Sequence, residues 1–226
     1  MKRTLTIGAA LAVAGVVAAG VLFGPDLVDG MRYQKAMAAI GDADKTNGGA
    51  WPQPQETCFF CHGVHGQSQN AWYPSLSGQP ATYLAAQLRA FASDRRGNAY
   101  MGPLARELDD AKIDALATYF ARQASARNET VPADAALDKR GMALVEARSC
   151  RACHGAALTG RDQAPRLAGQ GQLYLEAQLA AFRSGQRHDP GGAMNGVAAT
   201  LSGDDTRAVA HYLAGLSPGS ADGAAR

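Results

Sequence analysis

The chain has 226 residues, enough for two small domains, but only 7% are aromatic although 46% are hydrophobic, so bulky core residues are scarce. Its formal charge of +2 comes entirely from Lys2 and Arg3, which leaves neither a basic stripe for nucleic acid nor an acidic tail. The four cysteines form only two C-x-x-C pairs, which excludes a separate disulfide framework.

Residues 1–24 are expected to direct the rest of the chain across a membrane. Lys2 and Arg3 precede an apolar run from Thr4 to Gly24, and positive residues stay on the cytoplasmic side. A signal peptidase could cut after Ala19, or the run of about 20 residues could remain as a membrane anchor. Both alternatives place the body of the protein outside the cytoplasm.

The rest of the chain divides into a tether, two domains, a linker and a tail. Residues 25–50 are a polar tether with a short helix expected over Met31–Ile40. The domains are expected at 51–127 and 137–217. The linker at 128–136 carries a proline and lacks helical periodicity, and the tail at 218–226 is expected to be flexible.

Helical periodicity dominates both domains, and no convincing alternation typical of strands occurs. Helix starts are expected at Pro80, at Asp109 or Asp110, at Asp134, and at Ser202, where Asp205 would complete a capping box. The faces expected to be buried are Tyr83, Leu84, Leu88 and Phe91; Ile113, Leu116, Ala117 and Phe120; Tyr174, Leu175, Leu179 and Phe182; and Val209, Leu213 and Leu216. The predicted fold is all-α, and such short helices favour a large prosthetic group in each core.

The second half of the chain repeats the first at an offset of about 92 residues, measured from Cys58 to Cys150. PSLSGQ at 74–79 matches PRLAGQ at 165–170, and YLAAQLRAF at 83–91 matches YLEAQLAAF at 174–182. A period of this length indicates a duplicated domain.

Each repeat contains the motif C-x-x-C-H, as CFFCH at 58–62 and CRACH at 150–154. This motif attaches c-type haem: both thiols bond to the porphyrin and the histidine binds the iron. A redox dithiol would need a preceding strand, and a four-cysteine zinc site would leave each repeat incomplete. Two covalent haems are therefore predicted, attached through Cys58, Cys61, Cys150 and Cys153.

The repeat also selects the iron ligands. His62 and His154 share one position, whereas His65 matches Ala157 and is expected to be a loop residue near the haem edge. Met101 and Met194 occupy matched loops, and their soft thioethers suit the sixth position of a carrier haem. His188 is the rival ligand in domain two.

Two loop prolines are candidates for holding the iron-binding histidines. The carbonyls of Pro74 and Pro165 could accept the ring N–H of His62 and His154, or these prolines could only shape their loops.

Other repeated polar residues could face the haem propionates. Tyr83 and Tyr174, with Gln79 and Gln170, recur where a helix could donate to propionates, although ordinary helix packing is the alternative. Arg166 has Ser75 as its counterpart, which would make the two sites electrostatically unequal.

Over residues 56–217, the tandem C-x-x-C-H-G motifs, P-x-L-x-G-Q loops, Y-L-x-x-Q-L helices and late methionines resemble the two-domain dihaem cytochromes c of the cytochrome c-four type. The resemblance implies two class I cytochrome c folds related by a pseudo-twofold axis, each wrapped round a covalent haem with His/Met ligation. It also implies single-electron transfer in the periplasm, typically from a quinol-oxidising cytochrome bc-type complex to a terminal oxidase.

Domain one departs from this family pattern before its motif. In the family a helix leads directly into each C-x-x-C-H, and Asp134 can cap such a helix in domain two. Pro52 and Pro54 forbid it in domain one. Either Met31–Ile40 supplies the missing helix, or haem one lacks its usual cover and shows unusual exposure.

Two other functions stay open beside that of a non-enzymatic carrier. The protein could be the dedicated electron-accepting subunit of a periplasmic dehydrogenase or an oxidase. A dihaem peroxidase or thiosulfate-oxidising enzyme would need an open iron position, with His65 or His188 as the acid/base group.

Overall fold

The structure is a computed structural model that describes residues 20–21, 23–24, 27–39, 41–42 and 53–219. The chain divides into two compact units, Met1–Trp51 and Pro52–Arg226. In the first unit, residues 27–39 are helical, which covers the expected Met31–Ile40 helix except for Ile40, outside the described residues.

Most of the expected signal peptide or anchor at 1–24 lies outside the described residues. The same holds for residues 220–226 of the expected tail at 218–226. Among the residues that are described, no helix is both long enough and apolar enough to cross a membrane.

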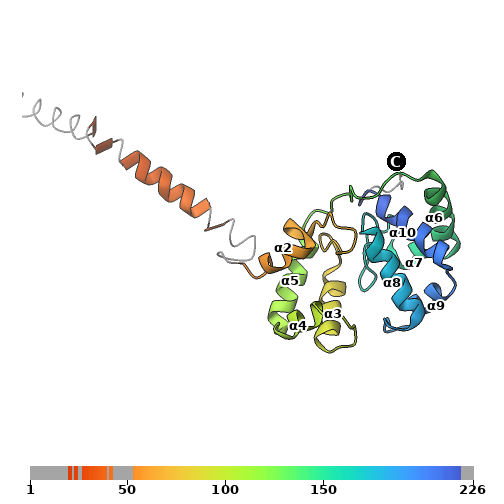
Figure 1. Cartoon of the computed structure of the whole chain (residues 1–226). Helices are drawn as coiled ribbons and strands as arrows, with labels where there is room; N and C mark the ends of the chain where they lie inside the picture. The colour runs from red at the N-terminus through yellow and green to blue at the C-terminus, as the bar shows by residue number, and fades with distance from the viewer. Residues whose placement is uncertain (1–19, 22, 25–26, 40, 43–52, 220–226) are drawn as a thin grey trace, which may run out of the picture. The chain divides into compact units, whose positions relative to one another are not determined.

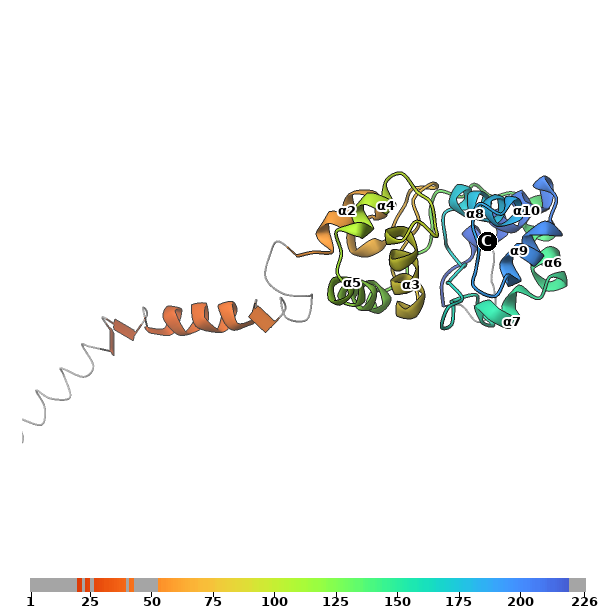
Figure 2. The same ribbon diagram turned by 90° about the horizontal axis from the view of Figure 1, so that it is seen from below.

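The second unit contains both predicted domains and, over its described residues, is built from helices. Domain one contains α2 (Glu56–His62), the 3₁₀ turn η1 (Val64–Gly66), α3 (Ala81–Ala92), α4 (Met101–Arg106) and α5 (Asp110–Arg122). Domain two contains α6 (Ala135–Ala147), α7 (Cys150–His154), α8 (Gln172–Ser184), α9 (Ala193–Ala199) and α10 (Gly203–Gly215). Figures 1 and 2 show the two groups as separate halves of this unit, with the non-helical residues 123–134 between them in the chain. The all-α prediction is confirmed.

The predicted helix caps are present. Asp109 begins α5 by accepting from the backbone N–H of Lys112 at 2.8 Å. Asp134 caps α6, and Ser202 with Asp205 forms the capping box of α10. Pro80 is the cap of α3 and not its first helical residue.

Each domain has its own small core. In domain one α3 packs on α4 and α5, and in domain two α8 packs on α9 and α10. All four residues expected on the buried face of α5 are buried, as are the three expected from Val209 onward. The buried clusters of the two domains are Leu84, Ala85, Ile113, Leu116, Ala117 and Phe120, and Val131, Val145, Leu158, Ala168, Leu175, Val209, Ala210, Tyr212, Leu213, Ala214 and Leu216.

The departure expected before the first motif is present. In domain two α6 packs along α10 so closely that a Cβ at Gly141 would clash with the backbone of Ala208 and with Tyr212. In domain one residues 53–55 are not helical, and no helix in the described part of this unit takes the place of α6. Ala111, Ala115 and Thr118 on α5 are therefore exposed.

Candidate functional site

The two C-x-x-C-H motifs form matched short helices, α2 and α7. Residues three apart lie on the same face of a helix, so Cys58 and Cys61 share one side of α2, and α7 repeats the arrangement. The glycine after each histidine has a positive φ, 78° at Gly63 and 84° at Gly155. Because other residues rarely adopt that conformation, glycine is needed where the chain leaves the motif.

The thiols are unsuited to thiolate chemistry. All four cysteines are unbridged. Burial, followed by the charge of Cys61, raises the pKa of Cys58, and burial raises the pKa of Cys150. A reactive dithiol needs a lowered pKa. Over the described residues, moreover, no three His, Cys, Asp or Glu side chains gather where they could hold a metal ion.

The two motif histidines are held by the predicted proline carbonyls. Nδ1 of His62 donates to the Pro74 carbonyl at 2.7 Å, and Nδ1 of His154 donates to the Pro165 carbonyl at 2.8 Å. A carbonyl only accepts, so Nδ1 carries the proton and Nε2 keeps its lone pair. Burial lowers the pKa of both histidines despite these bonds, which favours the neutral ring.

Nε2 of each ring has no hydrogen-bond partner among the residues described here. A neutral imidazole whose Nδ1 is anchored and whose Nε2 is free has the form needed to bind iron. The residues present therefore fit a covalent haem in each domain.

Gln79 and Gln170 bind backbone of the opposite domain. Oε1 of Gln79 accepts from the Arg166 N–H at 2.8 Å, and its Nε2 donates to the Arg166 carbonyl at 3.0 Å. Gln170 makes the same pair with Ser75, at 2.7 and 3.0 Å. These reciprocal bonds follow the pseudo-twofold symmetry. They differ from both roles considered for Gln79 and Gln170 from the sequence, which were propionate binding and helix packing.

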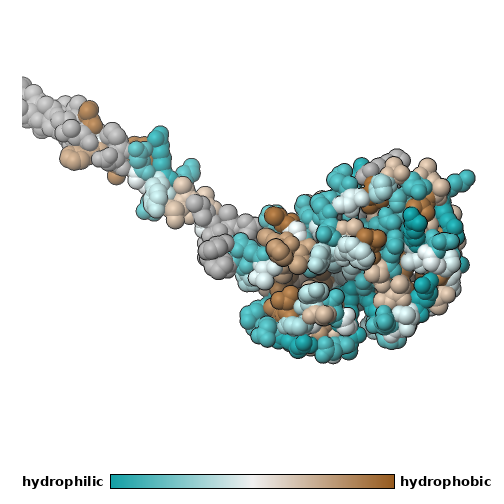
Figure 3. All heavy atoms as spheres, viewed as in Figure 1, coloured by the Kyte–Doolittle hydropathy of each residue, from teal (hydrophilic) through white to brown (hydrophobic). Residues whose placement is uncertain are grey.

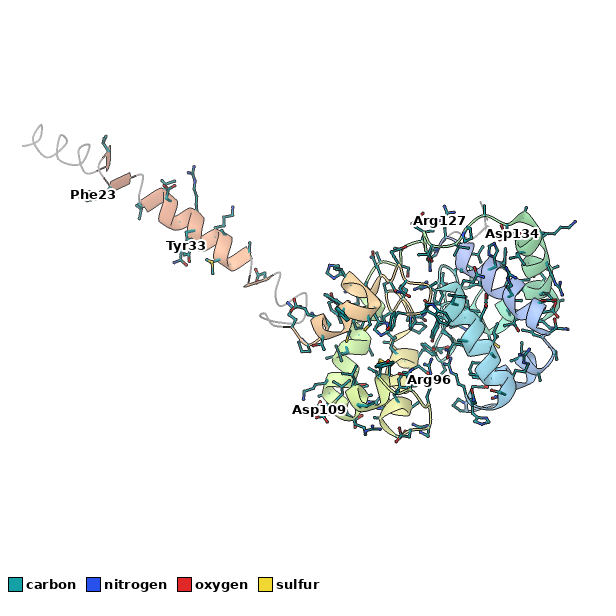
Figure 4. The ribbon with its side chains drawn as sticks, viewed as in Figure 1. Phe23, Tyr33, Arg96, Asp109, Arg127 and Asp134 are labelled. Carbon is teal, nitrogen blue, oxygen red and sulfur yellow. The ribbon has the colours of Figure 1, made fainter. Side chains whose placement is uncertain are left out.

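A second symmetric cluster lies between α3 and α8 and consists of Tyr83, Gln87, Arg96, Tyr174, Gln178 and Arg187, of which Figure 4 labels Arg96. Arg96 donates to the Tyr174 hydroxyl and Arg187 to the Tyr83 hydroxyl, each at 3.1 Å. Both guanidiniums also donate to the side-chain carbonyls of Gln87 and Gln178. The Arg96 guanidinium lies over the ring of Phe91 and that of Arg187 over the ring of Phe182, each 4.5 Å from the ring centroid.

The cluster carries positive charge without a carboxylate: over the described residues neither guanidinium forms an ion pair. Burial would raise the pKa of Tyr174, but Arg96 and Arg187 outweigh it and hold this pKa at about 8. Burial and the neighbouring Tyr174 raise the pKa of Tyr83. The two arginines match in the repeat, a signal that could have identified them, yet sequence reasoning gave them no role.

Arg166 is a third cation at the interface and is 1% exposed. It donates to the carbonyls of Ser77 and Ala168, while its Nε has no partner among the described residues. Burial lowers its pKa to about 10. Domain one has the neutral Ser75 at this position, so the charge of Arg166 has no counterpart there.

The matched methionines, expected in loops, lie instead in the first turns of matched short helices. Met101 is the first residue of α4, and its backbone N–H binds the Asn98 side chain at 2.8 Å. Met194 lies in the first turn of α9, and its N–H binds Asp189 at 2.9 Å. Both are half-buried, whereas His188 is exposed. His65 is also exposed and bonds through Nδ1 to the Tyr119 hydroxyl at 2.7 Å.

Within the second unit, over its described residues, the exposed large hydrophobic side chains lie mainly in domain one. Phe60, inside the first motif, is 96% exposed. Figure 3 shows hydrophobic surface over the α2 region of the face in view. In domain two only Met142, at 48%, belongs to this group over the described residues. The others in domain one are Val64, Trp72, Tyr73, Tyr100 and Leu104.

Comparisons with known proteins agree with this geometry. Residues 139–217 match the cytochrome c family model, and residues 53–120 match that of cytochrome C oxidase, cbb3-type, subunit III. The thiosulfate dehydrogenase electron acceptor of Thiomonas intermedia is 37% identical, with 83% of this chain and 94% of that protein covered. Cytochrome c4 of Thiocapsa roseopersicina is 36% identical, with 82% and 98% covered.

Two solved structures are also similar. Reduced cytochrome c4 from Pseudomonas stutzeri has a TM-score of 0.66 at 32% identity, covering 72% of this chain and 94% of that one. Thiosulfate dehydrogenase (TsdBA) from Marichromatium purpuratum has a TM-score of 0.64 at 36% identity, covering 70% of this chain but 36% of that one. This chain therefore belongs to the cytochrome c4 family and is a dihaem electron-transfer protein with two covalent c-type haems.

Proposed function

We propose that the protein is a periplasmic carrier without catalytic activity of its own, in which His62 and Met101 bind the iron of haem one and His154 and Met194 bind that of haem two. The observation that carries this proposal is the matched pair of proline carbonyls. Each holds a neutral imidazole by Nδ1 and leaves Nε2 for a metal. When bound, each haem supplies an iron that takes up and releases one electron at a time.

The protein's own residues hold, shield and tune these two centres. The cysteines of α2 and α7 tether the porphyrins, and the proline carbonyls orient the histidines. The methionines, placed alike on α4 and α9, are thioether donors that favour reduced iron. Two saturated irons would leave no position for a substrate, which supports a carrier over an enzyme.

The arginine cluster supports propionate binding at the domain interface. Shielding positive charge from water is costly unless an anion offsets it. Arg96 and Arg187 have no carboxylate partner among the described residues, and haem propionates are anions that the bound cofactors bring. Tyr83 and Tyr174, for which the sequence left propionate contact and ordinary helix packing open, belong to this cluster.

A dedicated electron acceptor for a dehydrogenase is the second candidate function. Relatives from Thiomonas intermedia and Stutzerimonas stutzeri are named thiosulfate dehydrogenase electron acceptors. This chain also matches a part of the longer Marichromatium purpuratum chain named thiosulfate dehydrogenase. A thiosulfate-oxidising dehydrogenase is therefore a candidate donor, beside the quinol-oxidising complex and terminal oxidase implied by the resemblance.

An optical spectrum of the purified holoprotein tests the ligation. We expect two haems per chain, the weak far-red band of Met-ligated ferric haem, and no high-spin fraction. A high-spin fraction that binds cyanide readily would overturn the carrier proposal in favour of an enzyme.

Stopped-flow reduction separates the two candidate functions. The oxidised protein is mixed either with a thiosulfate dehydrogenase and thiosulfate or with membranes that contain a quinol-oxidising complex. Fast reduction only by the dehydrogenase would favour the dedicated acceptor, and fast reduction only by the membranes would favour the respiratory carrier.

A further inference from the structure

We infer that Gln79 and Gln170 are positioning residues that act across the domain interface, so that each domain helps to set the reduction potential of the haem in the other. Gln79, in domain one, acts on His154. Gln170, in domain two, acts on His62. The inference rests on the proposed ligation of iron by these histidines.

The connection passes through one planar peptide unit in each direction. The carbonyl of Pro165 and the N–H of Arg166 belong to the same peptide group, which is rigid because its C–N bond has partial double-bond character. His154 donates to that carbonyl at 2.8 Å, and Gln79 accepts from that N–H at 2.8 Å. A continuous chain therefore runs from the Gln79 amide through the peptide to the imidazole.

The matching connection runs from domain two to domain one. His62 donates to the Pro74 carbonyl at 2.7 Å, and the N–H of the same peptide group, on Ser75, donates to Gln170 at 2.7 Å. The repetition of both bonds at both sites shows that the arrangement belongs to the duplicated architecture.

Both hydrogen-bonded connections are shielded from water, and each glutamine binds its partner residue through two hydrogen bonds. Gln79 is 3% exposed and Gln170 is 2% exposed. The side-chain amide of each glutamine accepts from the backbone N–H of the residue after the proline and donates to the carbonyl of that residue. These two bonds fix the orientation of the peptide plane. Such bonds are stronger in a low dielectric, and bonds in series polarise one another.

The direction of the effect on the potential follows from this polarisation. An acceptor on the peptide N–H makes the carbonyl of the same peptide a stronger acceptor, which in turn raises the basicity of the imidazole. A more basic ligand favours ferric iron and lowers the potential. Removing the glutamine acceptor should therefore raise the potential of the haem in the opposite domain.

The test uses Gln79→Met and Gln170→Met in the full-length holoprotein, since methionine keeps the length of the side chain but lacks the amide. Each haem is followed in a redox titration by NMR, through the Nδ1–H resonance of its histidine. The resonance of His62 is assigned through Tyr73, whose ring centroid lies 6.4 Å from that of the imidazole.

We expect Gln79→Met to raise the potential of haem two and to shift the His154 Nδ1–H resonance, with haem one unchanged. Gln170→Met should do the reverse. The expected size is a three- to tenfold change in the equilibrium constant for reduction, a tenfold change being about 59 mV for one electron.

Two control variants separate positioning from general loosening. Gln123→Met removes a glutamine bond within domain one, to the Tyr119 carbonyl, and should leave both potentials unchanged. Thr82→Val removes a bond across the interface to the Asp162 carbonyl that involves neither peptide group, and should also leave both unchanged.

The inference is overturned if each glutamine variant shifts both haems alike, shifts only the haem of its own domain, or shifts neither. Haem content and far-UV circular dichroism equal to those of the unsubstituted protein establish that the variants fold. Failure of the proposed ligation would instead appear in the unsubstituted protein, as the absence of two low-spin His/Met spectra.

Discussion

Nη2 of Arg96 donates to the hydroxyl of Tyr174 at 3.1 Å, from one cytochrome domain to the other. With its symmetric counterpart, Arg187 on Tyr83, this contact places two guanidiniums at the interface without a carboxylate partner among the described residues. The interface is therefore an electrostatic element as well as a packing surface.

Arg96→Met should lower the reduction potentials, because removing a positive charge from the proposed propionate site favours the ferric state. We expect up to a tenfold change in the equilibrium constant for reduction, about 59 mV, measured by potentiometric titration. Since Arg96 favours the ionised form of Tyr174, the pKa of that tyrosine should rise, as followed by ultraviolet titration. The exposed neighbour Arg95, changed to Met, is the control, and an equal effect from it would contradict a specific role for Arg96.

Met101→Ala and Met194→Ala should each open one iron only. In each variant we expect half of the far-red band to disappear and one cyanide or imidazole to bind per chain, because the remaining haem keeps its thioether. Met142→Ala, on the exposed surface of α6, should leave the spectrum unchanged. An unaltered spectrum in either of the first two variants would mean that the substituted methionine is not the ligand.

Gly141→Ala should destabilise domain two, since the new methyl group would meet the backbone of Ala208 and the side chain of Tyr212. Overpacking of this kind costs about 1–3 kcal/mol, which thermal unfolding followed by circular dichroism would detect. Gly215→Ala, at the end of α10 with open space around it, is the matched control and should be neutral or slightly stabilising. Equal stability of the two variants would show that α6 and α10 pack less closely than described.

Asp205 should stabilise α10 in a pH-dependent manner. Its bonds to Arg140 and Ser202 hold its pKa at about 2, below its ordinary value of 3.8. A lowered folded-state pKa means that the contribution is present above pH 4 and is lost as the pH falls through about 2. The Tm difference between the protein and Asp205→Asn should therefore be constant from pH 7 to pH 4 and shrink below it. A difference that grows on acidification would contradict this assignment.

Features that depend on local spacing could be predicted from the residues alone. The C-x-x-C-H motifs imply covalent haem because the thiols and the histidine must share one helical turn, and α2 and α7 provide that turn. The caps at Asp109, Asp134 and Ser202 follow from bonds that span two or three residues. Comparing the two halves also separated His62 from His65 and pointed to Pro74 and Pro165.

The contacts across the domain interface could not be predicted in this way, because they depend on how the two domains pack. Gln79 and Gln170 meet backbone 87 and 95 residues away, and periodicity along the chain carries no information about partners so distant. The burial of Arg166 and the shared arginine cluster depend in the same way on the pseudo-twofold packing of two complete domains. Symmetry between the halves was readable from the residues, but the contact surface that symmetry creates exists only once both halves are folded and packed.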